Sequence, residues 1–106
     1  MKKIHIAIGV SDISRSVKDY SERLGCQPVV VIANEYALWR TDILNFSIRY
    51  DAANPGMLRH LGWEDSSACE FTQEKDVNGI VWERFTTEQQ SNEIKSLRKK
   101  GPGGLK

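Results

Sequence analysis

Cysteine and histidine are both scarce in this chain of 106 residues, which contains two of each. Cys26 and Cys69 do not form the closely spaced pairs that hold structural zinc, so a cysteine-based zinc site is not expected. No export signal precedes them. We therefore expect both to be reduced, buried and small apolar residues, rather than a disulfide or a catalytic thiol.

The chain also lacks an excess of either charge, with 15 basic and 14 acidic side chains and a net charge of +1. Nucleic-acid-binding proteins usually carry a basic excess, so no nucleic-acid partner is expected. No stretch approaches the roughly 20 apolar residues of a membrane helix. The apolar segment 4–10 is too short for a signal peptide and is interrupted by His5. We therefore expect a cytoplasmic protein without membrane contact.

The length suits a single domain at residues 1–100, followed by a flexible, glycine-rich tail at 101–106. Residues 4–10 alternate between isoleucine or valine and smaller or polar residues, which predicts a strand with His5 opposite the apolar face. Ser11 is the expected N-cap of a helix that carries an apolar stripe and ends at Gly25. Three further strands are predicted at residues 29–32, 36–40 and 44–50.

The second half begins after a polar loop at 51–56. Strands are expected at 58–63 and 80–85, the latter after an Asn-Gly turn, and a weaker strand at 68–73. A last helix is expected to start at Thr86 or Thr87 and to reach about Lys99. Strands and helices in this order predict an α+β fold.

Three residues suggest metal chemistry: the only two histidines, His5 and His60, and Glu83 in the middle of a strand. A carboxylate is unfavourable there unless that face of the strand is exposed to solvent or the charge is paired. Two imidazoles and one carboxylate bind a divalent ion well and leave coordination positions open. Spacing alone cannot join the three, because a single histidine or glutamate on a strand is more often structural or solvent-exposed.

Three segments then occur in a suggestive order: HIAIGVSDISRSVKDYSERLG (5–25), RHLGWE (59–64) and DVNGIVWERF (76–85). They resemble the first strand and helix, the start of the second module, and the final turn and strand of the vicinal-oxygen-chelate superfamily. That superfamily includes glyoxalase I, fosfomycin-resistance transferases, methylmalonyl-CoA epimerase, extradiol dioxygenases and bleomycin-resistance proteins. The resemblance covers about residues 4–85. It implies βαβββ modules in a cupped mixed sheet, with a first module at 4–50 and an abbreviated second module at 57–99.

The resemblance implies that His5, His60 and Glu83 hold one divalent metal ion, with zinc, manganese, nickel and iron left open. Glu83 would also move protons as the catalytic residue. The position of a fourth family ligand falls on Asn45. Because an amide oxygen is a weak ligand and cannot act as a base, a glyoxalase I mechanism is disfavoured.

The second module departs from the family pattern because only residues 64–67 separate two of its strands, which is too short for a helix. We expect the C-terminal helix, residues 87–99, to pack where the missing helix would have been. We also expect a homodimer in which His5 of one chain joins His60 and Glu83 of the other.

Strand alternation adds substrate-binding candidates around the expected metal. Asn45, Ser47 and Arg49 share one face of their strand, and Trp39 is expected on the same face one strand over. Arg49 would anchor an anionic substrate group through a bidentate pair, although a surface salt bridge explains it equally well.

The leading functional hypothesis is a metal-dependent lyase, isomerase or transferase acting on a small, oxygen-rich metabolite chelated through vicinal oxygens. The metal would stabilise an enolate or alkoxide. An extradiol dioxygenase also uses two histidines and a carboxylate, but it needs a further active-site histidine that this chain lacks. The alternative outside enzymology is a drug- or metabolite-binding protein of the bleomycin-resistance type.

Overall fold

The structure is a computed structural model that describes residues 2–100, with side chains described to residue 98. The tail predicted at 101–106 lies outside the described residues. Within residues 2–100 the fold is α+β, as predicted, with one mixed sheet and two helices, the second of them C-terminal. The elements are β1 (Lys2–Val10), α1 (Ile13–Leu24), β2 (Val30–Ile32), β3 (Tyr36–Arg40), β4 (Leu44–Tyr50), β5 (Leu58–Asp65), β6 (Thr72–Lys75), β7 (Val81–Phe85) and α2 (Thr87–Lys100).

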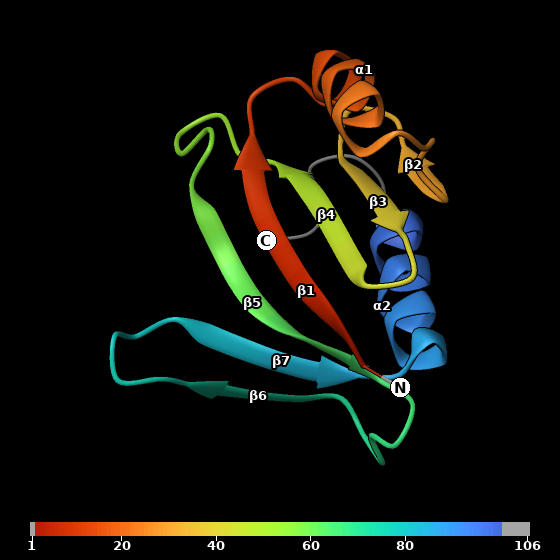
Figure 1. Cartoon of the computed structure of the whole chain (residues 1–106). Coiled ribbons are helices and arrows are strands. Elements are labelled where there is room, and N and C mark those ends of the chain that lie inside the picture. The colour runs from red at the N-terminus through yellow and green to blue at the C-terminus, as the bar shows by residue number, and fades with distance from the viewer. Residues whose placement is uncertain (1, 101–106) are drawn as a thin grey trace.

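The seven strands follow the order β2-β3-β4-β1-β5-β7-β6, as Figure 1 shows. The strand β1 is central and pairs in parallel with β4 and antiparallel with β5. The strand β5 in turn pairs in parallel with β7. The two halves of the chain therefore meet along the β1–β5 pairing, which brings residues far apart in sequence onto neighbouring strands.

The helix α1 covers one face of the first half of the sheet. Its Ile13 packs with Val10, Ala37, Trp39 and Ile48 in a buried core. Asp12, not Ser11 as expected, is the N-cap, because its side chain accepts a hydrogen bond from the backbone N–H three residues later. Gly25 ends the helix as predicted, in the left-handed conformation that a side chain disfavours.

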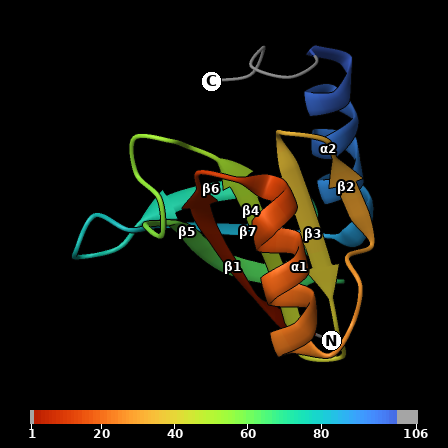
Figure 2. The same cartoon turned by 90° about the horizontal axis from the view of Figure 1, so that it is seen from above.

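The helix α2 lies on the opposite face of the sheet from α1 (Figure 2). Ala37 and Trp39 of β3 pack with α1, whereas the residues between and before them pack with α2, and successive residues of a strand face opposite sides. Ile94 and Leu97 of α2 pack with Tyr36 and Leu38 of β3. We expected this helix to replace the one missing from the second module. It packs instead over the first half, because its few apolar residues find their partners on β2 and β3.

Two smaller expectations are also corrected. The strand predicted at 68–73 forms instead at Thr72–Lys75, where pairing with β7 begins. The residues before it form a turn, in which Asp65 accepts hydrogen bonds from the backbone N–H groups of Ser67 and Ala68. Both cysteines are free, but Cys69 is exposed and Cys26 half-buried, so neither is the fully buried residue we expected. No helix within residues 2–100 has the length and hydrophobicity that crossing a membrane requires.

Candidate metal centre

The three expected ligands lie side by side on consecutive strands of the sheet: His5 on β1, His60 on β5 and Glu83 on β7. In the pairing register His5 lies opposite Gly62, which lies opposite Glu83. A side chain at Gly62 would place its Cβ 2.3 Å from the backbone oxygen of Glu83. Glycine is therefore required there to keep β7 at this distance, a role that sequence reasoning missed.

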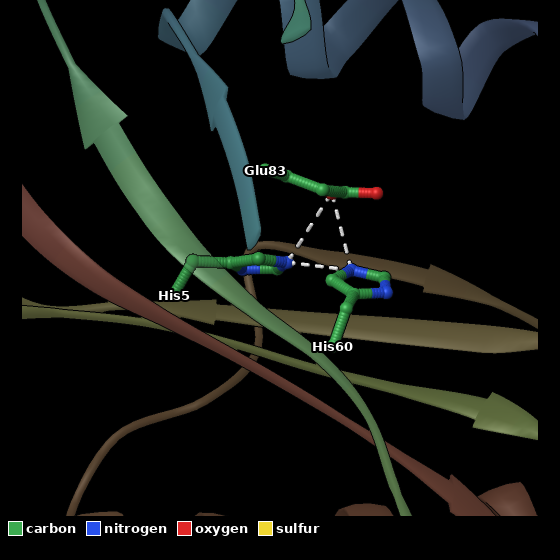
Figure 3. A group of neighbouring side chains, drawn as sticks. All are labelled: His5, His60 and Glu83. Carbon is green, nitrogen blue, oxygen red and sulfur yellow. Dashed lines mark hydrogen bonds and ion pairs between the residues drawn. The ribbon is translucent and has the colours of Figure 1, made fainter. Parts of the chain in front are cut away.

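The ligand atoms of the three side chains point toward one another (Figure 3). The Nε2 atoms of His5 and His60 are 2.9 Å apart. Glu83 Oε1 lies 3.1 Å from Nε2 of His60 and 3.8 Å from Nε2 of His5. Atoms that share one ion, each at about 2.0–2.2 Å, lie roughly 3 to 3.5 Å apart at tetrahedral or octahedral angles. The two separations that involve His60 lie close to this range and the His5–Glu83 separation exceeds it, so a small shift of Glu83 toward His5 would let all three bind one divalent ion.

The environment of His5 determines which ring nitrogen faces the site. Its Nδ1 lies 2.8 Å from Oδ1 of Asn45 and 3.2 Å from the backbone oxygen of the same residue. Both partners are acceptors, so Nδ1 must carry the proton and donate it. Neutral His5 then presents the lone pair of Nε2 to the site, which is the form that binds a metal.

Asn45 is in turn held from behind by a buried network. Its Nδ2 donates to Oε1 of Glu64 at 2.7 Å and to Oε1 of Gln90 at 2.8 Å. Gln90 Nε2 donates back to Oδ1 of Asn45 at 3.1 Å, and Arg40 Nε donates to Glu64 at 2.8 Å. The four residues come from β4, β5, α2 and β3, so His5 is oriented by most of the fold.

This network corrects the role expected for Asn45. The residue is fully buried and its amide groups are engaged with protein partners, so it does not face the cavity as a substrate-binding residue. It does not supply a fourth metal ligand either. It orients a ligand instead, a function that the outer partners of metal-binding histidines commonly serve.

The electrostatics favour the metal-binding protonation states of His5 and Glu83. Burial, and then the neighbouring His60, lower the pKa of His5, which favours the neutral imidazole. Burial raises the pKa of Glu83, but the hydrogen bond and charge of His60 outweigh it, together with a hydrogen bond from Gln73. The net pKa of Glu83 is lowered. A neutral imidazole and a carboxylate are the forms that metal binding requires.

An open cavity of about 120 Å³ adjoins the three ligands. Ser47 and Arg49, predicted to face the substrate, both line it. The aromatic rings of Phe71 and Phe85 form part of its apolar wall, and Ile94 of α2 closes another side. The cavity thus combines the candidate ligands with polar and apolar surfaces within one chain.

Trp39, the remaining predicted substrate-binding residue, lies on the wrong face. It is fully buried under α1, where its Nε1 donates to Oγ of Ser21 at 3.2 Å. The antiparallel register pairs Trp39 with Phe46 and Leu38 with Ser47. Directly paired residues share a face, so Leu38, not Trp39, lies on the side of the cavity.

Tyr36 and Arg59 are among the cavity residues that the sequence did not reveal. Burial raises the pKa of Tyr36 to about 12, so its hydroxyl stays protonated. Arg59 lies next to His60 in sequence, and strict alternation would put these two on opposite faces. The pairing of β5 with β1 shifts between Ala7 and Ile8, and this irregularity accounts for both residues lining the cavity. The sequence signal for Arg59 is its place in the segment RHLGWE, directly before the candidate ligand His60.

The site also bears on the expected sharing of ligands between two chains. His5, His60 and Glu83 converge within a single chain, because β1 pairs with β5 of the same chain. A second copy is not needed to complete the set.

Comparisons with known proteins assign no family to this chain. No family model matches the sequence, and no curated protein matches it. The function proposed below therefore rests on the residues of the site and on the order of the strands.

Proposed function

We propose that the chain is a metal-dependent lyase, isomerase or transferase of the glyoxalase-like, vicinal-oxygen-chelate type, acting on a small oxygen-rich metabolite. The observation that carries this proposal is the convergence of His5, His60 and Glu83, which uses both histidines of the chain. The strand order supports the family: a βαβββ unit is followed by a shorter unit whose first strand pairs with β1. This is the arrangement expected of one full and one abbreviated module.

One divalent ion is the proposed cofactor, with zinc, manganese, nickel and iron all compatible with a set of two imidazoles and one carboxylate. His5, His60 and Glu83 would hold it. When bound, such an ion acts as a Lewis acid toward two adjacent oxygens of a substrate. The three protein ligands would leave coordination positions open for those oxygens, and the cavity adjoins the ligands.

The chain's own side chains supply the remaining functions. Tyr36 keeps its proton and offers a hydroxyl at the cavity wall. Phe71 and Phe85 stack on each other with ring centroids 5.5 Å apart and exclude water from one side. Glu83 is the proposed proton carrier, since Gln73 holds its Oε2 while Oε1 faces the two histidines.

We further propose a homodimer in which each chain keeps its own three ligands. Met57, Leu58 and Trp63, on β5 and the loop before it, are apolar and exposed, which supports a contact surface on this half of the molecule. Sedimentation at several protein concentrations tests the proposal. A monomer that binds metal stoichiometrically would contradict the dimer and leave the metal site untouched.

The function itself is tested first by metal content. The purified protein is stripped with a chelator, reloaded with zinc or manganese, and assayed for bound metal. We expect one ion per chain, and a loss of at least tenfold in affinity for His60→Ala, because one of three ligands is removed. Glu88→Gln, an exposed change on α2, is the matched control. Wild-type protein that takes up no metal would overturn the proposal.

A further inference from the structure

Two arginines line the cavity beside the candidate metal ligands. Arg49 comes from β4 and Arg59 from β5, and the strand between them is β1. The β1 residue paired with Arg49 is Gly9. A Cβ there would lie 3.0 Å from the backbone oxygen of Asn54 and 3.1 Å from Cβ of Asp51, so the loop after β4 packs against this end of β1.

Both arginines line the same cavity, Arg59 from an exposed position and Arg49 from a half-buried one. An arginine remains charged at any ordinary pH, so the cavity holds two like charges. Two like charges brought together in a cavity cost free energy, and such arrangements are typical of sites that bind the opposite charge.

The charge of the cavity depends on the metal. Among the described residues that line it, Arg49 and Arg59 are balanced by two carboxylates, Glu83 and Glu93. A divalent ion held by Glu83 and the histidines would leave the lining with a net positive charge. The occupied site would then attract an anionic ligand and disfavour a neutral one of the same shape.

The cavity beside the metal ligands is small and open to solvent. Its volume is about 120 Å³, so the part of a ligand that lies next to the metal ligands is a small group.

We propose that Arg49 and Arg59 form an anion subsite that selects a small carboxylate whose adjacent oxygen reaches the metal: a hydroxy- or oxo-carboxylate of a few carbon atoms. Arginine pairs with carboxylates through two parallel hydrogen bonds, which adds orientation to attraction. The hydroxyl of Tyr36 lies on the same wall and offers a further donor. The inference rests on the proposed metal site, since the metal supplies the second point of attachment.

The test uses two probes of equal size. Glycolate and its amide, glycolamide, share a hydroxyl next to a carbonyl oxygen and differ in charge. Calorimetric titration of metal-loaded protein should show glycolate binding at least tenfold more tightly than glycolamide. Arg49→Gln and Arg59→Gln should each weaken glycolate at least tenfold and leave glycolamide unchanged. Arg98→Gln, an exposed arginine of α2 outside the cavity, is the control and should change neither.

Metal uptake by the same variants separates this inference from the proposed function, and thermal unfolding shows that each variant is folded. Arginine variants that take up metal normally but bind glycolate as tightly as wild type would overturn the anion subsite alone. Equal binding of the two probes by wild type, or no binding of glycolate, would overturn it as well. A wild type that takes up no metal, yet binds glycolate through the two arginines, would overturn the proposed function and support the subsite.

Discussion

The two halves of the sheet hold the candidate site in different ways. The half formed by β1 to β4 is covered by α1 on one face and by α2 on the other, with Trp39 and Ile48 fully buried between its layers. In the other half β6 is exposed along its whole length, and Trp63 on β5 is exposed by 36%. The first half supplies a rigid support, while the second contributes ligands from a thinner and less covered layer.

This difference extends to the ligands. His5, from the first half, is 2% exposed and is fixed by Asn45 and the network behind it. Its ring also packs against Phe85 with centroids 5.0 Å apart. His60, from the second half, is half-buried and reaches the site from the irregular start of β5. We infer that His5 is the fixed point of the site and that His60 and Glu83 adjust to the ion.

The largest effect should come from the covered half. Trp39→Ala removes a fully buried indole and should lower the free energy of unfolding by about 3–5 kcal/mol. Trp63→Ala, in the other half, removes a partly exposed ring and should cost less than half as much. Urea unfolding of both variants measures the contrast. Equal losses would mean that the two halves are equally well packed.

The next effect concerns the support of His5. Asn45→Ala removes the Oδ1 acceptor shared by His5 and Gln90 and a donor to Glu64. Glu64 keeps Arg40 and His5 keeps the backbone oxygen of residue 45, so the loss should be about 1–3 kcal/mol of stability. The substitution should also lower metal affinity by about 10- to 100-fold, as the loss of an orienting partner commonly does. Asn92→Ala, on the exposed side of α2, is the control. Unchanged metal affinity in a folded Asn45→Ala protein would show that His5 needs no such support.

Much of this arrangement was predictable because strand and helix periods depend on local sequence. Alternation along single strands correctly grouped His5 with the small residues of β1, and Ser47 with Arg49 on β4. Predictions failed where pairing between strands decides the outcome. The face of Trp39 depends on the β3–β4 register, and no pattern within residues 36–40 reveals that register.

Other features depended on distant contacts or on local irregularities. Arg59 reaches the cavity where the pairing with β1 shifts, an irregularity that period-two reasoning excludes. The helix α2 has only two buried apolar side chains, so its sequence did not show which face of the sheet it would cover. Asn45 was predicted to face the substrate but lies behind His5, because its amide pairs with Glu64 and Gln90, which lie far along the chain.

A smaller effect should appear in the pH dependence of the metal-free protein. The pKa of His5 is lower in the folded state than in the unfolded chain, so protons bind the unfolded state more readily. Stability should therefore be fully present above pH ~6.5 and decline as the pH falls below it, by ~1.4 kcal/mol for each unit of difference in pKa. The lowered pKa of Glu83 adds a further loss below pH ~4.3.

Unfolding of metal-free protein between pH 8 and 5 measures this decline. In His5→Gln the slope between pH 7 and 5 should be shallower than in wild type, whatever the variant's absolute stability. The variant's own loss of packing does not change with pH, so it does not affect the comparison of slopes. A slope that is unchanged in the variant would show that His5 titrates alike in the folded and unfolded states.

The smallest effect is expected on the exposed side of the site. Gln73 lies on β6 and donates to Oε2 of Glu83 at 2.9 Å, but it is exposed, so water can replace its amide. Gln73→Ala should cost less than about 1 kcal/mol and lower metal affinity only a few-fold. Glu74→Ala, the next residue along the same edge strand, should change neither. If Gln73→Ala instead weakened metal binding as much as Asn45→Ala, both sides would hold their ligands equally firmly, and His5 would no longer be the fixed point of the site.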